Sequence, residues 1–224
     1  MSNLNNVQRR LAEGTSSWLM FEFHCKRGDL FSEKYLTVPV GQILTGLFPG
    51  QIKSEINHPN LQTGNAGRPP QLDFIVLNGA NWEVVVETKW VGKSVISLDQ
   101  IIWDLMRLEI LAREQNLTCY FILSGFSKKI SPIIENTHFS KTVPVAPVIT
   151  RAKNTKIYID LQDQTQAVKN SLNSRMQKYP AAFFSEVISC DYPHFYPDAT
   201  INMSFQTYVW KINPYLKARR VNSL

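Results

Sequence analysis

The sequence predicts an α/β fold (of the α+β kind) in which helices cover both faces of a central mixed β-sheet. Segments 71–77 and 82–88 are apolar on both of their alternating faces, apart from a few charged residues. This pattern is typical of strands covered on each side by helices. A strand, a helix and a further strand also follow one another over 82–124, and this order favours a parallel strand pair beside antiparallel ones.

Two helices are expected before the sheet. Residues 5–25 have apolar positions at helical spacing, and Gly28 separates them from a second helical run over about 30–47. Residues 51–56 then have the composition of a first strand. The segment 58–68 is rich in Asn, Gly and Pro and is expected to be a loop.

The middle of the chain predicts a hairpin followed by a strand crossover. Strands 71–77 and 82–88 are rich in β-branched and aromatic residues, and the link Asn-Gly-Ala-Asn between them has hairpin length. Residues 97–115 carry the strongest helical pattern of the chain. A short apolar strand is expected over 118–124 and a further helix over 126–136. The apolar positions of the long helix are Leu98, Ile101, Ile102, Leu105, Leu108 and Leu111.

The last third of the chain has weaker patterns. An extended segment over 142–150, a strand over 156–161 and a helix over 163–177 are expected, followed by strands within 183–190 and 201–211. We predict one domain over residues 1–224, with a core at about 30–136 and a C-terminal extension at about 142–224. The extension could lengthen the sheet, form a dimer surface or select a substrate.

Composition and charge narrow the function classes. With 44% hydrophobic and 19% charged residues, the chain is expected to be globular. The net charge of +6 suits a polyanionic partner such as nucleic acid. Three widely spaced cysteines without a CxxC pattern indicate reduced, mostly buried thiols. No apolar signal segment opens the sequence and no run of eighteen apolar residues occurs, so a soluble cytoplasmic protein without a membrane partner is expected.

Three charged residues interrupt the two apolar strands of the hairpin. Asp73 lies in the first strand, and Glu87 and Lys89 lie at the end of the second. Alternation along a strand directs Glu87 and Lys89 to the same side, and Asp73 can meet them across the ladder. Charged side chains are rarely buried without a partner or a metal. Their position therefore indicates a functional cleft.

These residue types suit metal-assisted hydrolysis. Asp73, Glu87 and the backbone carbonyl of Thr88 offer the hard oxygen ligands that Mg²⁺ or Mn²⁺ prefers. The ammonium of Lys89 could hold and polarise an attacking water, or offset the charge that builds up on a phosphoryl group in the transition state.

The pattern resembles the PD-(D/E)xK, or restriction-endonuclease-like, phosphodiesterases. Asp73, Glu87 and Lys89 match the motif of that superfamily. In the superfamily a proline precedes the aspartate directly, whereas here Leu72 does so and the nearest proline is Pro70. The order helix, three strands, helix, strand over about 30–136 also matches the superfamily core.

The resemblance implies a magnesium- or manganese-dependent nuclease. Its substrate would be nucleic acid, with DNA favoured because DNA enzymes dominate the superfamily, and an endonuclease in a restriction or defence context would fit. A homodimer would be needed to cut both strands of a symmetric site with one active centre in each subunit.

The resemblance also implies two further site residues. Superfamily members often add a glutamate from the first core helix, for which Glu33 is the candidate; Glu22 and Glu55 remain alternatives. Gln100 resembles a glutamine that some exonuclease-like members place beside the active site. It begins a polar stripe with Asp104 and Arg107, and the alternative interpretation is an exposed glutamine beside a surface ion pair.

Two other interpretations remain open. Glu87 and Lys89 could form a solvated pair on one strand face, with Asp73 as a turn cap. The fold could also be a catalytically inactive nuclease-like module that binds nucleic acid or assists assembly. Retention of all three charges in apolar strands argues against loss of catalysis. The four histidines lack zinc spacing, and no GxSxG, P-loop or GxGxxG motif occurs.

Overall fold

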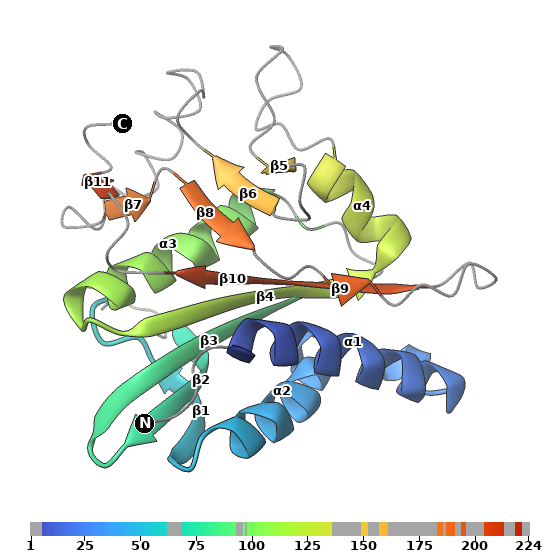
Figure 1. Cartoon of the computed structure of the whole chain (residues 1–224), viewed down its shortest axis with the longest axis horizontal. Coiled ribbons are helices and arrows are strands. Elements are labelled where there is room, and N and C mark those ends of the chain that lie inside the picture. The colour runs from blue at the N-terminus through green and yellow to red at the C-terminus, as the bar shows by residue number, and fades with distance from the viewer. Residues whose placement is uncertain are drawn as a thin grey trace.

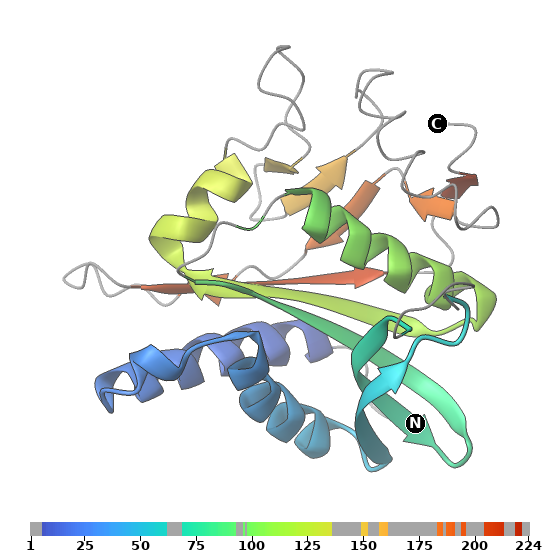
Figure 2. The same cartoon turned by 180° about the vertical axis from the view of Figure 1, so that it is seen from behind.

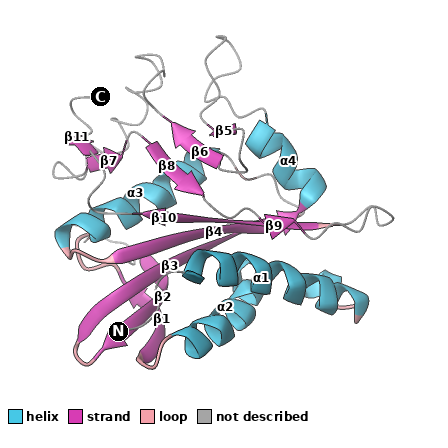
Figure 3. Cartoon of the chain, viewed as in Figure 1, coloured by secondary structure: helices cyan, strands magenta, loops and turns pink. Residues whose placement is uncertain are grey.

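The structure is a computed structural model that describes most of the first 135 residues and several segments of the remainder. A mixed β-sheet forms its centre, and helices lie on both sides of the sheet (Figures 1 and 3). The described residues are 6–61, 69–92, 96, 98–135, 149–151, 157–160, 183–185, 187–190, 194–195, 204–212 and 218–220.

The central sheet has six strands in the order β1-β2-β3-β4-β10-β9. The first three strands form an antiparallel meander, β3 and β4 pair in parallel, and β10 pairs antiparallel with both β4 and β9. The expected combination of antiparallel and parallel pairs is therefore confirmed. The strands are β1 (Gln51–Asn57), β2 (Gln71–Asn78), β3 (Asn81–Val91), β4 (Thr118–Phe126), β9 (His194–Phe195) and β10 (Phe205–Ile212).

Helices cover both faces of this sheet (Figure 2). On one face, α1 (Val7–His24) and α2 (Glu33–Leu47) pack on a cluster of buried aliphatic and aromatic side chains. On the other face, α3 (Leu98–Glu114) covers a second apolar cluster, and α4 (Ser127–Glu135) follows β4 on the same side. A short 3₁₀ turn, η2 (Gly28–Leu30), connects α1 to α2.

Alternation along β3 directs its side chains to these two faces. Val84 and Val86 belong to the cluster under α1 and α2, whereas Val85 belongs to the cluster under α3. Glu87 and Lys89 continue the series of Val85, so their side chains start from the α3 face of the sheet. Strand alternation therefore brings both charged residues to α3, where Glu87 pairs with Arg107 and Lys89 pairs with Asp104.

The β2–β3 hairpin turns at Gly79, whose φ of 64° is the left-handed conformation that glycine adopts at little cost. The paired residues of the hairpin run from the turn to the pair Phe74↔Val86. Beyond that pair, β2 continues beside β1 to Gln71, whereas β3 continues beside β4 to Val91. The two strands therefore diverge and leave a fork in the sheet.

The C-terminal extension contributes to the central sheet rather than standing apart from the core. Strand β10 pairs with β4 along its whole length. Helix α1 lies over β10, where Gln8 donates to the carbonyl of Val209 and the hydroxyl of Ser16 donates to Thr207. The core therefore also contains α1 and β10, which lie outside the range of about 30–136 that was expected from the sequence.

Other segments of the extension form small sheets in the orders β5-β6-β8 and β11-β7. The expected strand at 183–190 is divided in two, and the expected helix at 163–177 lies outside the described residues. These strands are β5 (Ile149–Arg151), β6 (Ile157–Asp160), β7 (Phe183–Ser185), β8 (Val187–Cys190) and β11 (Ala218–Arg220).

The expectation that the cysteines are mostly buried is met in part. Cys119 is a buried free thiol, but Cys25 is exposed at the end of α1, so the expectation of burial is wrong for that residue. None of the described helices has the length and apolar character required to span a bilayer.

Gly125 is required where β4 passes the end of β3. A Cβ atom at this position would lie 2.2 Å from the carbonyl oxygen of Val91, a backbone atom that cannot move aside freely. We expect Gly125→Ala to lower the free energy of unfolding by about 1–3 kcal/mol in urea denaturation. Gly46 in α2 has no atom within 4 Å of such a Cβ, so Gly46→Ala should instead raise stability by up to about 1 kcal/mol. Equal effects of the two variants would contradict this packing.

Candidate active site

The carboxylate of Asp73 fills the fork between β2 and β3. Its Oδ2 atom accepts hydrogen bonds from the backbone N–H of Thr88 at 2.6 Å and from the Thr88 hydroxyl at 2.7 Å. The strand ladder has ended at Phe74 and Val86, so the side chain supplies an acceptor that the neighbouring strand no longer offers. Asp73 therefore holds the two strands at a fixed separation.

Glu87 lies under α3 and is paired with an arginine of that helix. Its side chain is only 5% exposed, and its Oε1 atom accepts a hydrogen bond from Arg107 at 3.0 Å. The same guanidinium nitrogen donates to Asp104 at 2.8 Å, one helical turn away on α3. Arg107 thus provides one cation for two buried carboxylates.

Lys89 connects the beginning of α2 to α3. Its Nζ atom lies 3.2 Å from Oε2 of Glu33, the first residue of α2, and 3.1 Å from Oδ2 of Asp104. These helices cover opposite faces of the sheet. Lys89 can reach both because it stands near the end of β3, beyond the point where β2 has diverged.

Together these groups form a connected set that we call the carboxylate cluster. It contains four acids and only two cations, so the ionised cluster carries an excess of two negative charges. Partly buried charge without full compensation is costly. The members are Glu33, Asp73, Glu87, Asp104, Lys89 and Arg107.

Burial raises the pKa of three acids in this cluster. It raises the pKa of Glu87 well above its usual value, because the opposing effect of Arg107 is smaller and the nearby charges of Asp73 and Asp104 add to the shift. It also raises the pKa of Asp73 against the hydrogen bonds from Thr88, and that of Glu33 against the ammonium of Lys89. Each of these acids would ionise more readily if a further cation were present.

Lys89 is held in its charged form. Burial alone would lower its pKa, but the carboxylates of Asp104 and Glu33 outweigh burial and raise it. The side chain is therefore an ammonium at neutral pH. It can donate hydrogen bonds and stabilise negative charge, but it cannot accept a proton from water in that state.

Two carboxylate oxygen atoms of the cluster accept no hydrogen bond from the described residues. Among the described residues, no hydrogen bond occupies Oδ1 of Asp73 or Oε2 of Glu87. The N–H and carbonyl of one strand residue point to the same side, so the carbonyl of Thr88 is directed toward Asp73 together with its N–H. In the described part of the chain, no three His, Cys, Asp or Glu side chains are grouped closely enough to hold a metal by themselves.

Four of the residues selected from the sequence come together at this site. Asp73, Glu87, Lys89 and Glu33 lie within electrostatic reach of one another, since Asp73 affects the pKa of both Glu87 and Glu33. Gln100 is exposed in the first turns of α3, one turn before Asp104. Its role beside the site stays a prediction.

The two alternative glutamates lie elsewhere. Glu22 is buried, but its carboxylate is occupied by Arg27, at 3.0 Å from both oxygens, and by the hydroxyl of Tyr35 at 2.7 Å. Glu55 is exposed on β1 at a position with φ of 55°. Of the three candidates, only Glu33 contacts the carboxylate cluster.

The interpretation of Asp104 and Arg107 as an ion pair on the protein surface is wrong. The pair forms, but Asp104 is only 6% exposed and both side chains face β3, where they contact Lys89 and Glu87. The regular spacing of Gln100, Asp104 and Arg107 shows in the sequence that these residues share one face of the helix. A polar stripe on a helix looks the same in sequence whether it faces solvent or a buried charge.

His58 is a further residue whose role was not identified from the sequence. Its Nδ1 atom accepts hydrogen bonds from the backbone N–H groups of Asn60 and Leu61, and its Nε2 atom lies 3.1 Å from the carbonyl of Arg107. These contacts require a neutral ring protonated at Nε2. Burial lowers the pKa of His58 to about 4. The ring ties the segment after β1 to α3 and holds the backbone at Arg107.

Comparison with protein-family models, with curated proteins and with solved structures finds no match to this chain.

Asp73→Asn is expected to stabilise the metal-free protein. The raised pKa of Asp73 means that folding favours its neutral form, so its contribution is greatest below pH 4 and is lost as the pH rises through the folded-state pKa. Asparagine removes this penalty and keeps an acceptor for Thr88. We expect a gain of about 1 kcal/mol at pH 8 in EDTA and a smaller gain at pH 5, measured by urea denaturation. A variant less stable than wild type at both pH values would contradict the charge imbalance.

His58→Gln tests the anchor at α3. Because the pKa of His58 is about 4 in the fold and 6.5 in the unfolded chain, its stabilisation is present above pH 6.5 and is lost as the pH falls toward 4. The stability advantage of wild type over His58→Gln should therefore shrink over this range, by up to about 3 kcal/mol. Exposed His24 provides the control, since His24→Gln should differ little from wild type at every pH. A constant advantage for His58 would show that it does not titrate as described.

Proposed function

We propose that the protein is a divalent-metal-dependent phosphodiester hydrolase, a nuclease of the PD-(D/E)xK type that acts on DNA. One observation carries the proposal. Four carboxylates and a protonated lysine converge beside a fork in the sheet, and burial disfavours ionisation of Glu33, Asp73 and Glu87. A site that keeps such an imbalance is typical of one that takes up a cation during function.

The order of elements supports a restriction-endonuclease-like core. Helix α2 is followed by β1, β2 and β3, then by α3 and the parallel strand β4. The resemblance implies this succession, and it implies that the acidic residues come from the second and third strands. Asp73 is on β2 and Glu87 is on β3. The general α/β architecture alone would not support a nuclease, because one fold can host many functions.

The available oxygen atoms fit Mg²⁺ or Mn²⁺. Asp73, Glu87 and the carbonyl of Thr88 would hold the ion, and water would complete its coordination. All three donors are hard oxygen atoms, and the first two are the acids most closely associated with the fork. The bound ion would polarise a phosphoryl oxygen and favour ionisation of a bound water.

Lys89 would act as a fixed positive charge at the reacting phosphate. Its Nζ atom is anchored by Glu33 and Asp104, so its direction does not depend on the substrate. The ammonium could donate to the attacking water and to a phosphoryl oxygen that gains charge in the transition state. Glu33 and Asp104 would therefore position the lysine, and Arg107 would hold Glu87 in place.

The substrate follows from charge and from the resemblance. A net charge of +6 favours binding to a polyanion through release of counterions. Among nucleic acids, DNA is the proposed substrate because the resembled superfamily is dominated by DNA enzymes. A restriction or defence role and a homodimer that cuts both strands remain predictions of the same resemblance. A cytoplasmic location remains a prediction from the hydropathy of the sequence.

A second candidate is a nuclease-like module that binds nucleic acid without cutting it. The ion pair of Arg107 with Glu87 favours this candidate, because a cation already neutralises one of the proposed metal ligands. The two candidates differ in one property. A nuclease must gain hydrolysis when the metal is added, whereas a binding module need not respond to it.

Cleavage of linear, circular and single-stranded DNA by the purified chain, with Mg²⁺, Mn²⁺ or EDTA, tests the proposal. We expect metal-dependent cutting that falls at least about 100-fold in Asp73→Ala and in Lys89→Ala, since each removes a metal ligand or a charge aimed at the transition state. Glu55→Gln provides a matched control, because Glu55 is exposed and lies outside the cluster. Cutting of the circular substrate would establish internal cleavage.

The outcomes separate the candidates. Metal-independent DNA binding without hydrolysis would favour the binding module. Equal activity in wild type and in both site variants would identify a contaminating nuclease and refute the site.

A further inference from the structure

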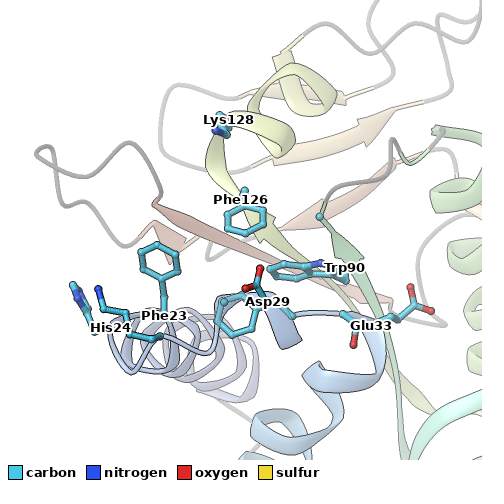
Figure 4. Close-up of a pocket in the computed structure, with 12 residues that line it drawn as sticks. Phe23, His24, Asp29, Glu33, Trp90, Phe126 and Lys128 are labelled. Atoms are coloured by element: carbon cyan, nitrogen blue, oxygen red, sulfur yellow. The ribbon is translucent and has the colours of Figure 1, made fainter.

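A pocket of about 800 Å³ opens beside the carboxylate cluster. Its walls come from the end of α1, the 3₁₀ turn, the start of α2, the ends of β3 and β4, and the first turn of α4 (Figure 4). Glu33 belongs both to this pocket and to the cluster, where it pairs with Lys89. A molecule that fills the pocket therefore ends next to the proposed cleavage site.

Aromatic rings form the floor of the pocket. Phe31, Trp90 and Phe126 line it and are each only partly buried. The Trp90 ring meets Phe31 at a centroid distance of 5.7 Å and Phe126 at 5.5 Å, both edge to face. These rings rest on a small buried cluster that includes Phe205. The packing holds them rigidly while part of their surface stays open to the pocket.

Basic side chains stand at the rim. Lys26 follows α1 and Lys128 opens α4; both line the pocket and are exposed, as is His24. Figure 4 shows Lys128 on the far side of Phe126 from Trp90, and His24 beside the end of α1. Two acids also line the pocket: Asp29, and Glu33, which is paired with Lys89. The lining of the pocket therefore combines an aromatic surface with two lysines and two acids.

We propose that this pocket holds an unpaired base of a single-stranded DNA segment, with Lys26 and Lys128 contacting its phosphates. The inference rests on the proposed function, because it places the strand so that the adjoining phosphate reaches Lys89 and the fork. It adds a preference that the cluster alone does not give, namely cleavage beside an unpaired nucleotide.

The chemistry of the pocket favours an unpaired base over a duplex. Bases in the interior of a duplex stack on one another and present only their edges, whereas an unpaired base can lay its face on Trp90 or Phe126. Stacking of this kind tolerates any base sequence. The volume of about 800 Å³ lies within the range of pockets that enclose small ligands. A purely structural aromatic cluster would gain more stability by closing over these rings.

Equilibrium binding to fluorescent oligonucleotides in EDTA tests the inference apart from catalysis. The probes are a single strand, its duplex and an abasic strand of equal length, which keeps the phosphates but lacks bases. We expect the single strand to bind at least about 10-fold more tightly than either of the other two, since stacking of bases on aromatic side chains adds to the affinity that the phosphates provide. Equal binding of the abasic strand would overturn the inference, and so would tighter binding of the duplex.

Two neighbouring lysines provide a matched pair of variants. Lys128 and Lys129 are both exposed on α4, but only Lys128 lines the pocket. Lys128→Glu should weaken single-strand binding at least about 5-fold more than Lys129→Glu, although both change the net charge equally. Equal losses would show that only overall charge matters and would overturn the inference.

A third comparison examines the aromatic surface. Trp90→Leu should reduce single-strand binding about 10-fold, while Trp90→Phe should retain most of it. If Trp90→Leu fails to fold, the comparison of Lys128→Glu with Lys129→Glu still tests the inference. Failure of the proposed function looks different: a protein that never cuts DNA but prefers unpaired strands through this pocket retains the base-binding site and loses only the cleavage preference. A metal-dependent nuclease without that preference loses only the inference.

Discussion

The hydrogen bonds from Thr88 to Asp73 are the constraint around which the candidate site is organised. β2 pairs with β3 only as far as the pair Phe74↔Val86. Beyond it, β2 still pairs with β1, and β3 still pairs with β4. An open backbone N–H at that point would be costly, and the Asp73 carboxylate satisfies it. Because the strands are held apart there, Glu87 and Lys89 can meet residues from both helical layers.

The carboxylate cluster lowers the stability of the metal-free protein, and the raised pKa values of three of its acids reflect this cost. Burial raises the pKa of Asp73, Glu87 and Glu33, although each has a hydrogen-bonding partner. Two cations are too few to balance the cluster, so it is less stable without a ligand than an uncharged packing of the same shape would be. Such a penalty at one location is typical of functional sites, where stability is given up for binding or catalysis.

Much of this architecture could be predicted from the sequence because its signals are local. Strand alternation placed Glu87 and Lys89 on one side, and helical periodicity identified α3 to within a residue at each end. The inward direction of Asp104 and Arg107 could not be predicted, since it depends on charges that are distant in sequence. The same holds for β10, whose pairing with β4 spans about 80 residues, and for His58, whose contact with α3 spans 49. The aromatic pocket likewise combines segments from three parts of the chain.

The central claim is that the fork binds a divalent cation. The most direct measurement is a crystal structure of the full chain grown with Mn²⁺, in which anomalous scattering locates the ion. We expect a peak within coordination distance of Asp73, Glu87 and the carbonyl of Thr88, at about 2.0–2.4 Å from their oxygen atoms. The absence of such a peak at saturating Mn²⁺, or a peak that involves neither Asp73 nor Glu87, would contradict the claim.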